Sequence, residues 1–247
     1  MSLPRPRVGI IQSNYIPWRG YFDFIRSVDL FVVYDDVQYS TGSWRNRNRL
    51  KMREGLKWIT VPVHASLSRA IDETPLCATG DWRRQHRRLL EQSLGPAPRF
   101  DDAVRIWDAG VAGPHPSISA LNVRLMRAVN EYLEIRTQML MSRAYPLAGA
   151  KTARLIDLLV RLGAGTYVSG PSAKGYLDED AFRRHRILLE YKTYDYEPYP
   201  QLWGAFAGAV TVLDLIANLG PQARHHLSSR TPNEAVVSTA EIDAGAR

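Results

Sequence analysis

The sequence has a single cysteine, Cys77, and no long hydrophobic run. One cysteine excludes an internal disulfide and any zinc cluster built from cysteines. No apolar run approaches the roughly 18 residues that a membrane-spanning helix needs. The N-terminal stretch, MSLPRPRVGI, also lacks an apolar core of signal-peptide length. We therefore expect a cytoplasmic protein with no membrane span.

Lysine is scarce as well, because it supplies only five of the 32 basic side chains. With 25 acidic residues the net charge is +7, and such a basic surface attracts phosphate groups. An excess of arginine over lysine often reflects the codon preference of a genome. We therefore expect a small anionic partner, such as a nucleotide-linked sugar, and do not expect nucleic-acid binding.

The hydrophobic patterns predict strands alternating with helices. Buried runs predict strands at residues 8–11, 30–34, 56–63, 137–142, 166–170 and 187–191. Helical spacing predicts helices at residues 21–27, 82–93, 100–108, 151–162 and 210–219, and one more that Ser117 or Ser119 caps and that ends near Glu134. This order indicates an α/β, Rossmann-like fold with a mainly parallel sheet and flanking helices.

The same patterns predict one large domain and a short C-terminal tail. We expect residues 1–230 to form a single α/β domain, in which residues 64–134 are a mostly helical insertion or cap. Residues 231–247 are small, polar and aperiodic, which predicts a flexible C-terminal tail.

Polar and aromatic side chains gather where the first predicted strand ends. Gln12, Asn14, Tyr15, Trp18 and Gly20 form this turn before the first helix. Ligands of open α/β sheets bind beyond the carboxyl ends of the strands. Amides orient carbonyl or hydroxyl groups, and aromatic rings stack on a base or a sugar. We expect a substrate site here, although either Trp18 or Tyr21 is expected to belong to the core.

Two carboxylates, Asp35 and Asp36, follow the second predicted strand. Paired carboxylates serve as a general base, as metal ligands or as acceptors for ribose hydroxyls. A helix cap or an ion pair with nearby arginines is an equally good interpretation for either residue alone. Gln38 lies close enough in sequence to join the substrate contacts.

An arginine-asparagine segment follows, in which cations alternate with amides. It consists of Trp44, Arg45, Asn46, Arg47 and Asn48. In an extended loop alternate side chains share a face, and guanidinium groups suit phosphate or carboxylate oxygens. We therefore interpret this segment as an anion-contacting loop.

A second turn follows the predicted strand at residues 166–170. Its candidate phosphate-binding residues are Ser169, Gly170, Ser172, Lys174 and Tyr176. The spacing differs from that of a Walker A loop. No histidine pair has the spacing of metal ligands, so we expect no metal site.

Several of these motifs resemble the WbqC-like protein family. The resemblance rests on IIQSNYIPWRGYFDFI, VDLFVVYDDVQYS and SWRNRNRLK, and it continues in GAKTARLIDLL, TYVSGPSAKGYLDEDAF, YPQLWGAF and VTVLDLIANLG. This family is met in bacterial gene clusters for O-antigen, the glycan of lipopolysaccharide, and for other surface glycans. A glycine-transferase role, which puts an aminoacyl group on a sugar, has been suggested for it. The resemblance therefore implies an enzyme of surface-glycan biosynthesis.

A second likeness concerns the first β-α-β unit and a later Ser/Lys loop, which closes over the phosphates in proteins with this unit and has residues 169–176 as its counterpart here. A strand followed by P-W-R-G-Y-F at a helix start resembles the H-x-G-H unit of nucleotidylyltransferases and pantothenate synthetase. Trp18 and Tyr21 occupy the two histidine positions around Gly20. Because those histidines stabilise the transferring phosphoryl group, their replacement argues against adenylyl transfer and leaves a nucleotide-binding crevice.

Three functions follow from these observations. The first is a transferase acting on a nucleotide-linked amino sugar, with Asp35 or Asp36 as base or anchor. In it Gln12 and Asn14 orient the acyl or sugar group, and Arg45, Arg47 and Lys174 hold anionic oxygens. The second is a nucleotidyltransferase or ligase, which would require a nucleoside triphosphate and Mg²⁺. The third is a non-catalytic binder of nucleotide-sugars or nucleic acid.

Overall fold

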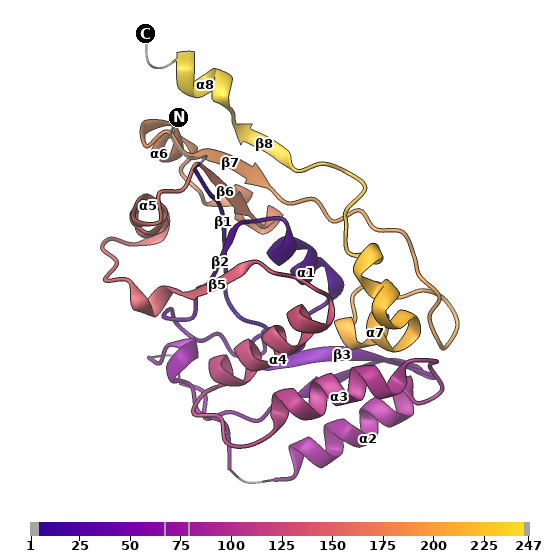
Figure 1. Ribbon diagram of the computed structural model, residues 1–247. Helices are drawn as coiled ribbons and strands as arrows, with labels where there is room; N and C mark the ends of the chain where they lie inside the picture. Colours follow the sequence, from indigo (N-terminus) through magenta and orange to yellow (C-terminus); the bar gives the residue numbers. More distant parts are fainter. Residues whose placement is uncertain (1–4, 67, 79, 245–247) are drawn as a thin grey trace.

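The computed structural model describes residues 5–66, 68–78 and 80–244. In these residues a six-stranded sheet has the order β5-β2-β1-β6-β7-β8 (Figure 1). Its strands are β1 (Arg7–Ile11), β2 (Leu30–Val33), β5 (Gln138–Met141), β6 (Thr166–Ser169), β7 (Leu188–Tyr191) and β8 (Glu234–Val237). The pairs from β5 to β7 are parallel, and β8 runs antiparallel to β7 at the edge. The predicted Rossmann-like α/β fold is confirmed.

Helices surround this sheet. They are α1 (Arg19–Arg26), α2 (Trp82–Leu94), α3 (Phe100–Val111), α4 (Ile118–Tyr132), α5 (Lys151–Arg161), α6 (Glu179–Arg184), α7 (Val212–Leu219) and α8 (Thr239–Ala244). Short 3-10 helices are η1 (Ile71–Glu73), η2 (Ser142–Ala144), η3 (Pro171–Gly175) and η4 (Gly220–His226). The predicted cap Ser117 accepts from the Ala120 amide, and Asp81 caps α2 by accepting from the Arg84 amide.

The two faces of β1 pack against different helices. Val8 and Ile10 belong to a core that contains residues of α5 and α6. Gly9 points the other way, where an added Cβ would lie 2.4 Å from the Phe24 ring. The absent side chain therefore lets α1 approach the sheet closely. The strand alternation thus places one helical layer on each face.

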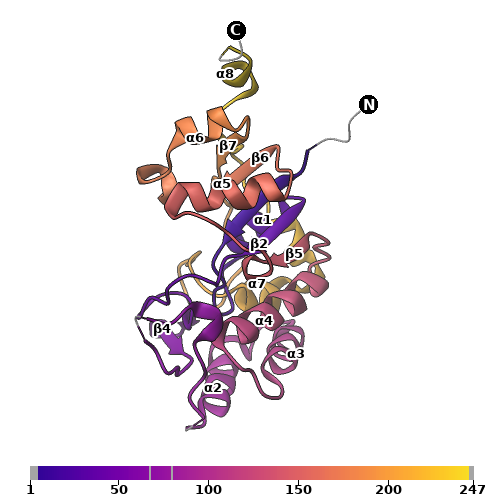
Figure 2. The ribbon, with the colours of Figure 1, turned by 90° about the vertical axis from the view of Figure 1, so that its left-hand side faces the viewer.

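A second group of elements packs beneath the sheet in Figure 1. The antiparallel hairpin of β3 (Arg47–Met52) and β4 (Gly55–Thr60) lies there with α2, α3, α4 and α7. Figure 2 shows α5 and α6 in the upper half of the molecule and α2, α3 and β4 in the lower half. The segment from residue 64 to residue 134 thus contributes η1 and the helices α2 to α4.

Two local predictions need correction. The arginine-asparagine segment, predicted as a loop, becomes strand β3 from Arg47 onward, because it pairs along its whole length with β4. The segment after residue 230, predicted as a flexible tail, contains β8 and α8. Its backbone pairs with the open edge of β7, and this pairing needs no apolar run in the sequence.

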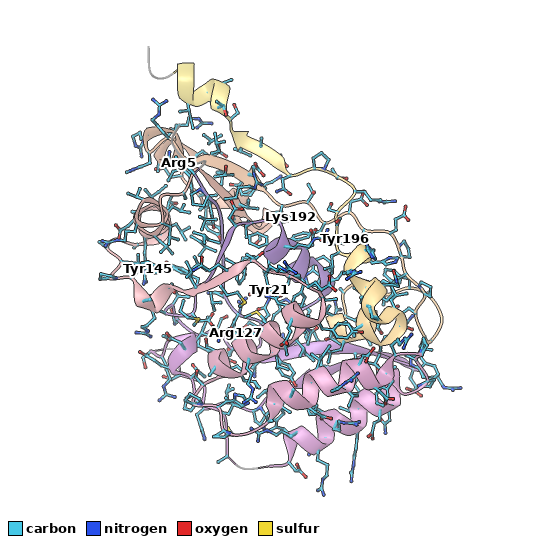
Figure 3. All side chains as sticks on the ribbon, in the orientation of Figure 1. Arg5, Tyr21, Arg127, Tyr145, Lys192 and Tyr196 are labelled. Carbon is cyan, nitrogen blue, oxygen red and sulfur yellow. The ribbon has the colours of Figure 1, made fainter. Side chains whose placement is uncertain are left out.

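A buried ion pair attaches the long segment after β7 to α1. Lys192 Nζ lies 2.6 Å from Asp23 Oδ2, and both side chains are almost fully buried. The Tyr196 hydroxyl donates to the same carboxylate oxygen at 2.6 Å. Figure 3 shows Lys192 and Tyr196 next to α1. This contact holds Tyr196 beside Trp18, which lines a pocket described below.

Candidate functional site

A polar cavity of about 560 Å³ opens at the carboxyl ends of β1, β2 and β6, facing the start of α5. Five separate chain segments line it. Its polar and aromatic lining residues are Gln12, Tyr34, Arg45, Lys151, Arg154, Tyr167, Ser169, Ser172 and Tyr176. This is the position where open α/β sheets bind their ligands. Gln12, Arg45, Ser169, Gly170, Ser172 and Tyr176, all predicted as site residues, therefore share one cavity.

The lining of the polar cavity is strongly biased toward positive charge. Arg45, Lys151 and Arg154 line it, and no Asp, Glu, His or Cys is among the described residues that do. Arg45 is mostly buried, and this burial lowers the pKa of its guanidinium group. Its Nη1 donates to the Ser13 carbonyl at 3.3 Å. A cavity with cations and no lining carboxylate suits an anionic ligand.

Asp36 positions one of these cations. Its Oδ2 accepts from Arg154 Nη2 at 2.5 Å, and Ser142 Oγ donates to Oδ1. The Asp36 carboxylate is 7% exposed, whereas the Arg154 side chain reaches the cavity wall. Asp36 therefore holds Arg154 at the cavity wall through an ion pair.

The start of α5 adds backbone donors to the same wall. Gly149, Ala150 and Lys151 line the cavity, and the N-cap residue Ala150 has no side-chain cap. The first amides of a helix lack intrahelical partners and attract anions. Lys151 has a φ of 50°, a conformation that side-chain-bearing residues seldom adopt. Strained backbone of this kind clusters at ligand sites.

Hydroxyl and amide groups complete the polar cavity. Ser169 is buried at the end of β6, whereas Ser172 and Tyr176 are exposed at its rim. The Gln12 side chain makes no hydrogen bond to any described residue, although its carbonyl accepts from Tyr21 at 2.9 Å. These groups are available to a ligand that carries hydroxyl or carbonyl groups.

Asp35 lies behind this wall, away from the cavity surface. Its side chain is fully buried, with Oδ1 accepting from the Ser13 amide at 2.8 Å and Oδ2 accepting from the Ser119 hydroxyl. Burial raises the pKa of Asp35, and these hydrogen bonds oppose the increase. Asp35 thus joins the ends of β1 and β2 to the start of α4.

A second, smaller pocket of about 190 Å³ lies on the other side of the turn after β1. Its lining residues are Asn14, Pro17, Trp18, Trp44, Asn48 and Ala209. We call it the aromatic pocket. Residues of the same two segments therefore line different cavities, with Gln12 and Arg45 at one and Asn14 and Trp44 at the other.

The turn that separates the two cavities is strained and clamped. Ile16 has a φ of 36°, which is unusual for a β-branched residue. Asn48 Nδ2 holds the turn by donating to the carbonyls of Tyr15 and Ile16 at 3.0 and 2.7 Å. The Tyr15 amide also donates to the Trp44 carbonyl at 2.9 Å. The Asn48 amide is thereby fully used, because its Oδ1 accepts from the Arg49 amide at 2.7 Å.

The structure places the other predicted site residues elsewhere. Tyr15 is fully buried and hydrogen-bonds to His86 and Trp107, so it belongs to the core rather than to a ligand site. Asn46 Nδ2 donates to the Val61 carbonyl at 2.8 Å, which ties the hairpin together. Gln38 is exposed and forms an isolated bridge with Ala70.

The remaining predicted residues have packing or surface contacts. Gly20 lies under the Trp18 ring, where an added Cβ would come within 2.4 Å of a ring carbon. Arg47 stacks on Trp58, with its Cζ 4.3 Å from the ring centre. Lys174 turns away from the polar cavity and pairs with Glu234 at 2.5 Å. It was predicted to hold an anion beside Ser172, but the β8 strand supplies it with a carboxylate.

Sequence reasoning missed four of the polar and aromatic lining residues, Tyr34, Lys151, Arg154 and Tyr167. One signal was present, because Lys151 and Arg154 begin a helix that directly follows the glycine of a turn. The positions that resemble the H-x-G-H histidines do not line the polar cavity. Trp18 lines the aromatic pocket, and the buried Tyr21 bonds the Gln12 backbone. In the described part of the chain no three His, Cys, Asp or Glu residues cluster as metal ligands.

No helix among the described residues is long and apolar enough to cross a membrane. No solved structure matches the chain. The chain is 46% identical over 226 residues to Uncharacterized protein Rv1507c of Mycobacterium tuberculosis, and the match covers 90% of this chain and 97% of that protein. The model of the WbqC-like protein family matches residues 12–226. With this match and the long relative agreeing, the chain belongs to the WbqC-like protein family.

Proposed function

We propose that the polar cavity binds a nucleotide-linked amino sugar or a similar phosphorylated glycan precursor. We further propose that the protein is a transferase that adds an aminoacyl group such as glycyl to this substrate in surface-glycan biosynthesis. One observation carries the binding proposal: Arg45, Lys151 and Arg154 face one cavity whose described lining contains no carboxylate. The reaction class rests on the glycine-transferase role that has been suggested for the WbqC-like family, to which the chain belongs.

Different lining residues suit the phosphate, the ring and the acyl group of such a transfer. Arg45, Arg154 and the start of α5 suit phosphate oxygens, because guanidinium forks and free helix amides both donate to anions. Tyr34 and Tyr176 offer rings to a base or a sugar. Gln12 and Ser172 can donate to the acyl oxygen, where charge develops during amide formation.

A second candidate function is a non-catalytic receptor for the same ligand. The observation that favours it is the described lining of the polar cavity, which lacks a carboxylate, histidine or cysteine to act as base or nucleophile. The two functions share the ligand and differ only in turnover, so one series of experiments separates them.

Binding is tested first by the melting temperature of the protein with uridine diphosphate N-acetylglucosamine, uridine diphosphate and uridine. A ligand at about 100 times its Kd stabilises the native state by about 2.7 kcal/mol. For a chain of this size we expect the melting temperature to rise by roughly 5–10 °C. The diphosphates should produce this rise and uridine should not. Failure of every phosphorylated ligand would remove the proposal.

The variant Arg45→Gln should weaken diphosphate binding by roughly 10- to 100-fold, because a charge-assisted hydrogen bond contributes about 1.5–3 kcal/mol. Arg53→Gln is the matched control, since Arg53 lies on the same hairpin and stacks on Trp203, away from the cavity. Unchanged binding by Arg45→Gln would contradict the assignment. Turnover is then tested by mass spectrometry with uridine diphosphate glucosamine, whose amine is free, and a glycyl thioester, whose thiol leaves as the amine forms the amide. A glycyl mass gain supports the transferase, and pyrophosphate release from ATP supports a ligase.

A further inference from the structure

The aromatic pocket has the construction of a ligand site in its own right. Trp18 and Trp44 line it together with Pro17, so most of its surface is apolar. Trp44 is 39% exposed, which leaves its ring accessible. Aromatic rings of this kind stack on flat or weakly polar ring faces. A ring-shaped group is therefore the kind of ligand that the pocket fits.

The wall of the aromatic pocket is held rigidly in place. Trp18 contacts Tyr194 and Tyr196, with ring centres 5.2 and 5.8 Å away. Gly20 provides the space beneath its ring. Asn48 clamps the strained turn at Ile16 that carries Asn14 and Trp18. Backbone strain maintained by several independent contacts is typical of ligand sites.

One side-chain amide at the aromatic pocket has no hydrogen-bond partner among the described residues. The Asn14 side chain makes no hydrogen bond to a described residue, and its Oδ1 is buried without a partner. Buried polar atoms are nearly always satisfied, so an unpaired amide beside a pocket points to a missing partner. A hydroxyl group on the edge of a bound ring would satisfy it after a small rotation of the side chain.

Two unpaired arginines lie next to the outer wall of the pocket. The Cζ atom of Arg49 is 5.5 Å from the centre of the Trp44 ring, and Arg47 stacks on the neighbouring Trp58. Trp44 and Trp58 themselves are 5.1 Å apart. Neither arginine forms an ion pair with a described carboxylate, and the Nε atom of each is buried without a partner. The hairpin therefore presents uncompensated positive charge beside an aromatic ring.

We propose that the aromatic pocket is a second ligand site, which takes the sugar ring of an anionic saccharide such as a uronic acid or a sugar phosphate. Trp18 and Trp44 pack against the ring, Asn14 bonds a hydroxyl, and Arg49 with Arg47 attracts the acidic group. The identification of this ligand as the second substrate rests on the proposed function. The existence of the site does not, because it shares no lining residue with the polar cavity.

The test follows the six indole N–H signals of the tryptophans by NMR during titration with glucuronate and with glucose. These two sugars share a ring and differ in one carboxylate. Glucuronate should shift the signals of Trp18 and Trp44, while those of the buried Trp82 and Trp107 stay in place. We expect glucose to bind about tenfold more weakly, and 0.5 M salt to remove this difference.

Variants separate the two parts of the proposal. Trp44→Ala should weaken glucuronate binding by about tenfold. Arg49→Gln should reduce the preference for glucuronate over glucose, and adding Arg47→Gln should remove it, whereas Arg53→Gln on the same hairpin should change nothing. Equal binding of glucose and glucuronate by the unaltered protein would overturn the anionic ligand. Unmoved Trp18 and Trp44 signals with glucuronate, glucose and glucose 1-phosphate would overturn the site.

Two further outcomes are decisive. Stronger binding of oligo(dT) than of glucuronate would overturn the saccharide assignment in favour of nucleic acid, which uses the same arginine and tryptophan side chains. Uridine diphosphate should leave the Trp18 and Trp44 signals unchanged, because it is assigned to the polar cavity. Loss of uridine diphosphate binding alone therefore reports on the proposed function, and loss of glucuronate binding alone reports on this site.

Discussion

The polar cavity and the aromatic pocket share two chain segments, the turn after β1 and the residues before β3, yet their linings differ in character. Gln12 and Arg45 line the polar cavity, which also contains two further cations. Asn14 and Trp44 line the aromatic pocket, which has no charged lining residue among those described. The Tyr15 amide and the Trp44 carbonyl join the two segments between the cavities.

This difference shows that residues clustered in sequence need not act together. Neither segment is a regular strand at these positions, so side chains one or two residues apart, such as Trp44 and Arg45 or Gln12 and Asn14, reach different cavities. A short run that mixes amides, aromatic rings and arginines therefore supplies two cavities at once. The two cavities share no lining residue, so a substitution can alter one of them without the other. The following variants test this independence.

The largest effect on stability is expected from Asp35→Ala, because Asp35 joins the ends of β1 and β2 to the start of α4. The change leaves the Ser13 amide and the Ser119 hydroxyl without their acceptor in a fully buried place. We expect the free energy of unfolding to fall by about 3–5 kcal/mol. Urea denaturation measures this loss, and ligands of both cavities should then bind only at lower temperature or lower urea concentration.

Asp36→Asn is the matched control for that experiment. Its carboxylate pairs with Arg154 at the polar cavity, and Asn keeps an acceptor there, so stability should fall by about 1.5–3 kcal/mol, less than for Asp35→Ala. Uridine diphosphate binding should weaken, whereas the aromatic pocket should keep its ligand. A loss of stability equal to that of Asp35→Ala would contradict the distinction between the two aspartates.

Acidification should lower the free energy of unfolding through His86. Burial lowers the pKa of His86 from 6.5 to about 4, and its Nδ1 bonds Tyr15 at the base of the turn. The unfolded chain binds a proton at His86 below about pH 6.5, and the folded chain does so only near pH 4. Stability is therefore lost as the pH falls through this window, by about 2 kcal/mol at pH 5.

Urea denaturation at pH 7 and pH 5 measures this effect, and His86→Gln should remove most of the difference. The variant is needed as a reference because the pKa values of Asp35 and Asp214 are raised by burial. These carboxyls take up protons more readily in the folded state, so they oppose the loss on acidification. An unchanged pH difference in His86→Gln would exclude His86 as the cause.

Particular elements show how much the sequence could reveal. β1 and β2 were predictable because each is a buried apolar run, and the rule that ligands bind at carboxyl ends then brought Gln12 and Ser169 to one cavity. β8 was missed because its first two residues, Glu234 and Ala235, are exposed at an edge. Pairing with an existing sheet edge leaves little trace in the sequence.

The site itself was predictable only in part, because several roles depend on distant contacts. Asp35 is buried by α4, whose Ser119 is 84 residues away. Arg154 occurs in an ordinary amphipathic helix, and only its contact with Asp36 directs it to the polar cavity. Trp44 and Arg45 are neighbours in sequence, and no pattern indicates that they line different cavities.

Gly20→Ala is expected to disturb the aromatic pocket alone. A Cβ at this position would meet the Trp18 ring at 2.4 Å, so the ring must move. Alanine favours a helix by up to about 1 kcal/mol, but the crowding should still cost about 1–2 kcal/mol overall. NMR should show a displaced Trp18 indole signal, with uridine diphosphate binding unchanged.

Gly175→Ala is the corresponding control, since nothing lies within 4 Å of a Cβ added there. It should alter neither stability nor the tryptophan signals. If Gly20→Ala left Trp18 and glucuronate binding as they were, the space beneath the ring would not be what defines the aromatic pocket.

The smallest effect is expected from Lys174→Gln. Lys174 and Glu234 form an ion pair at 2.5 Å with both side chains about half exposed, and such pairs contribute at most about 1 kcal/mol. Uridine diphosphate titrations should give the same affinity before and after the change, because Lys174 does not line the polar cavity. If Lys174→Gln weakened binding as much as Arg45→Gln, Lys174 would have to leave Glu234 and contact the ligand in the bound state. The closing Ser/Lys loop implied by the likeness to nucleotidylyltransferases would then describe the bound state better than the arrangement seen here.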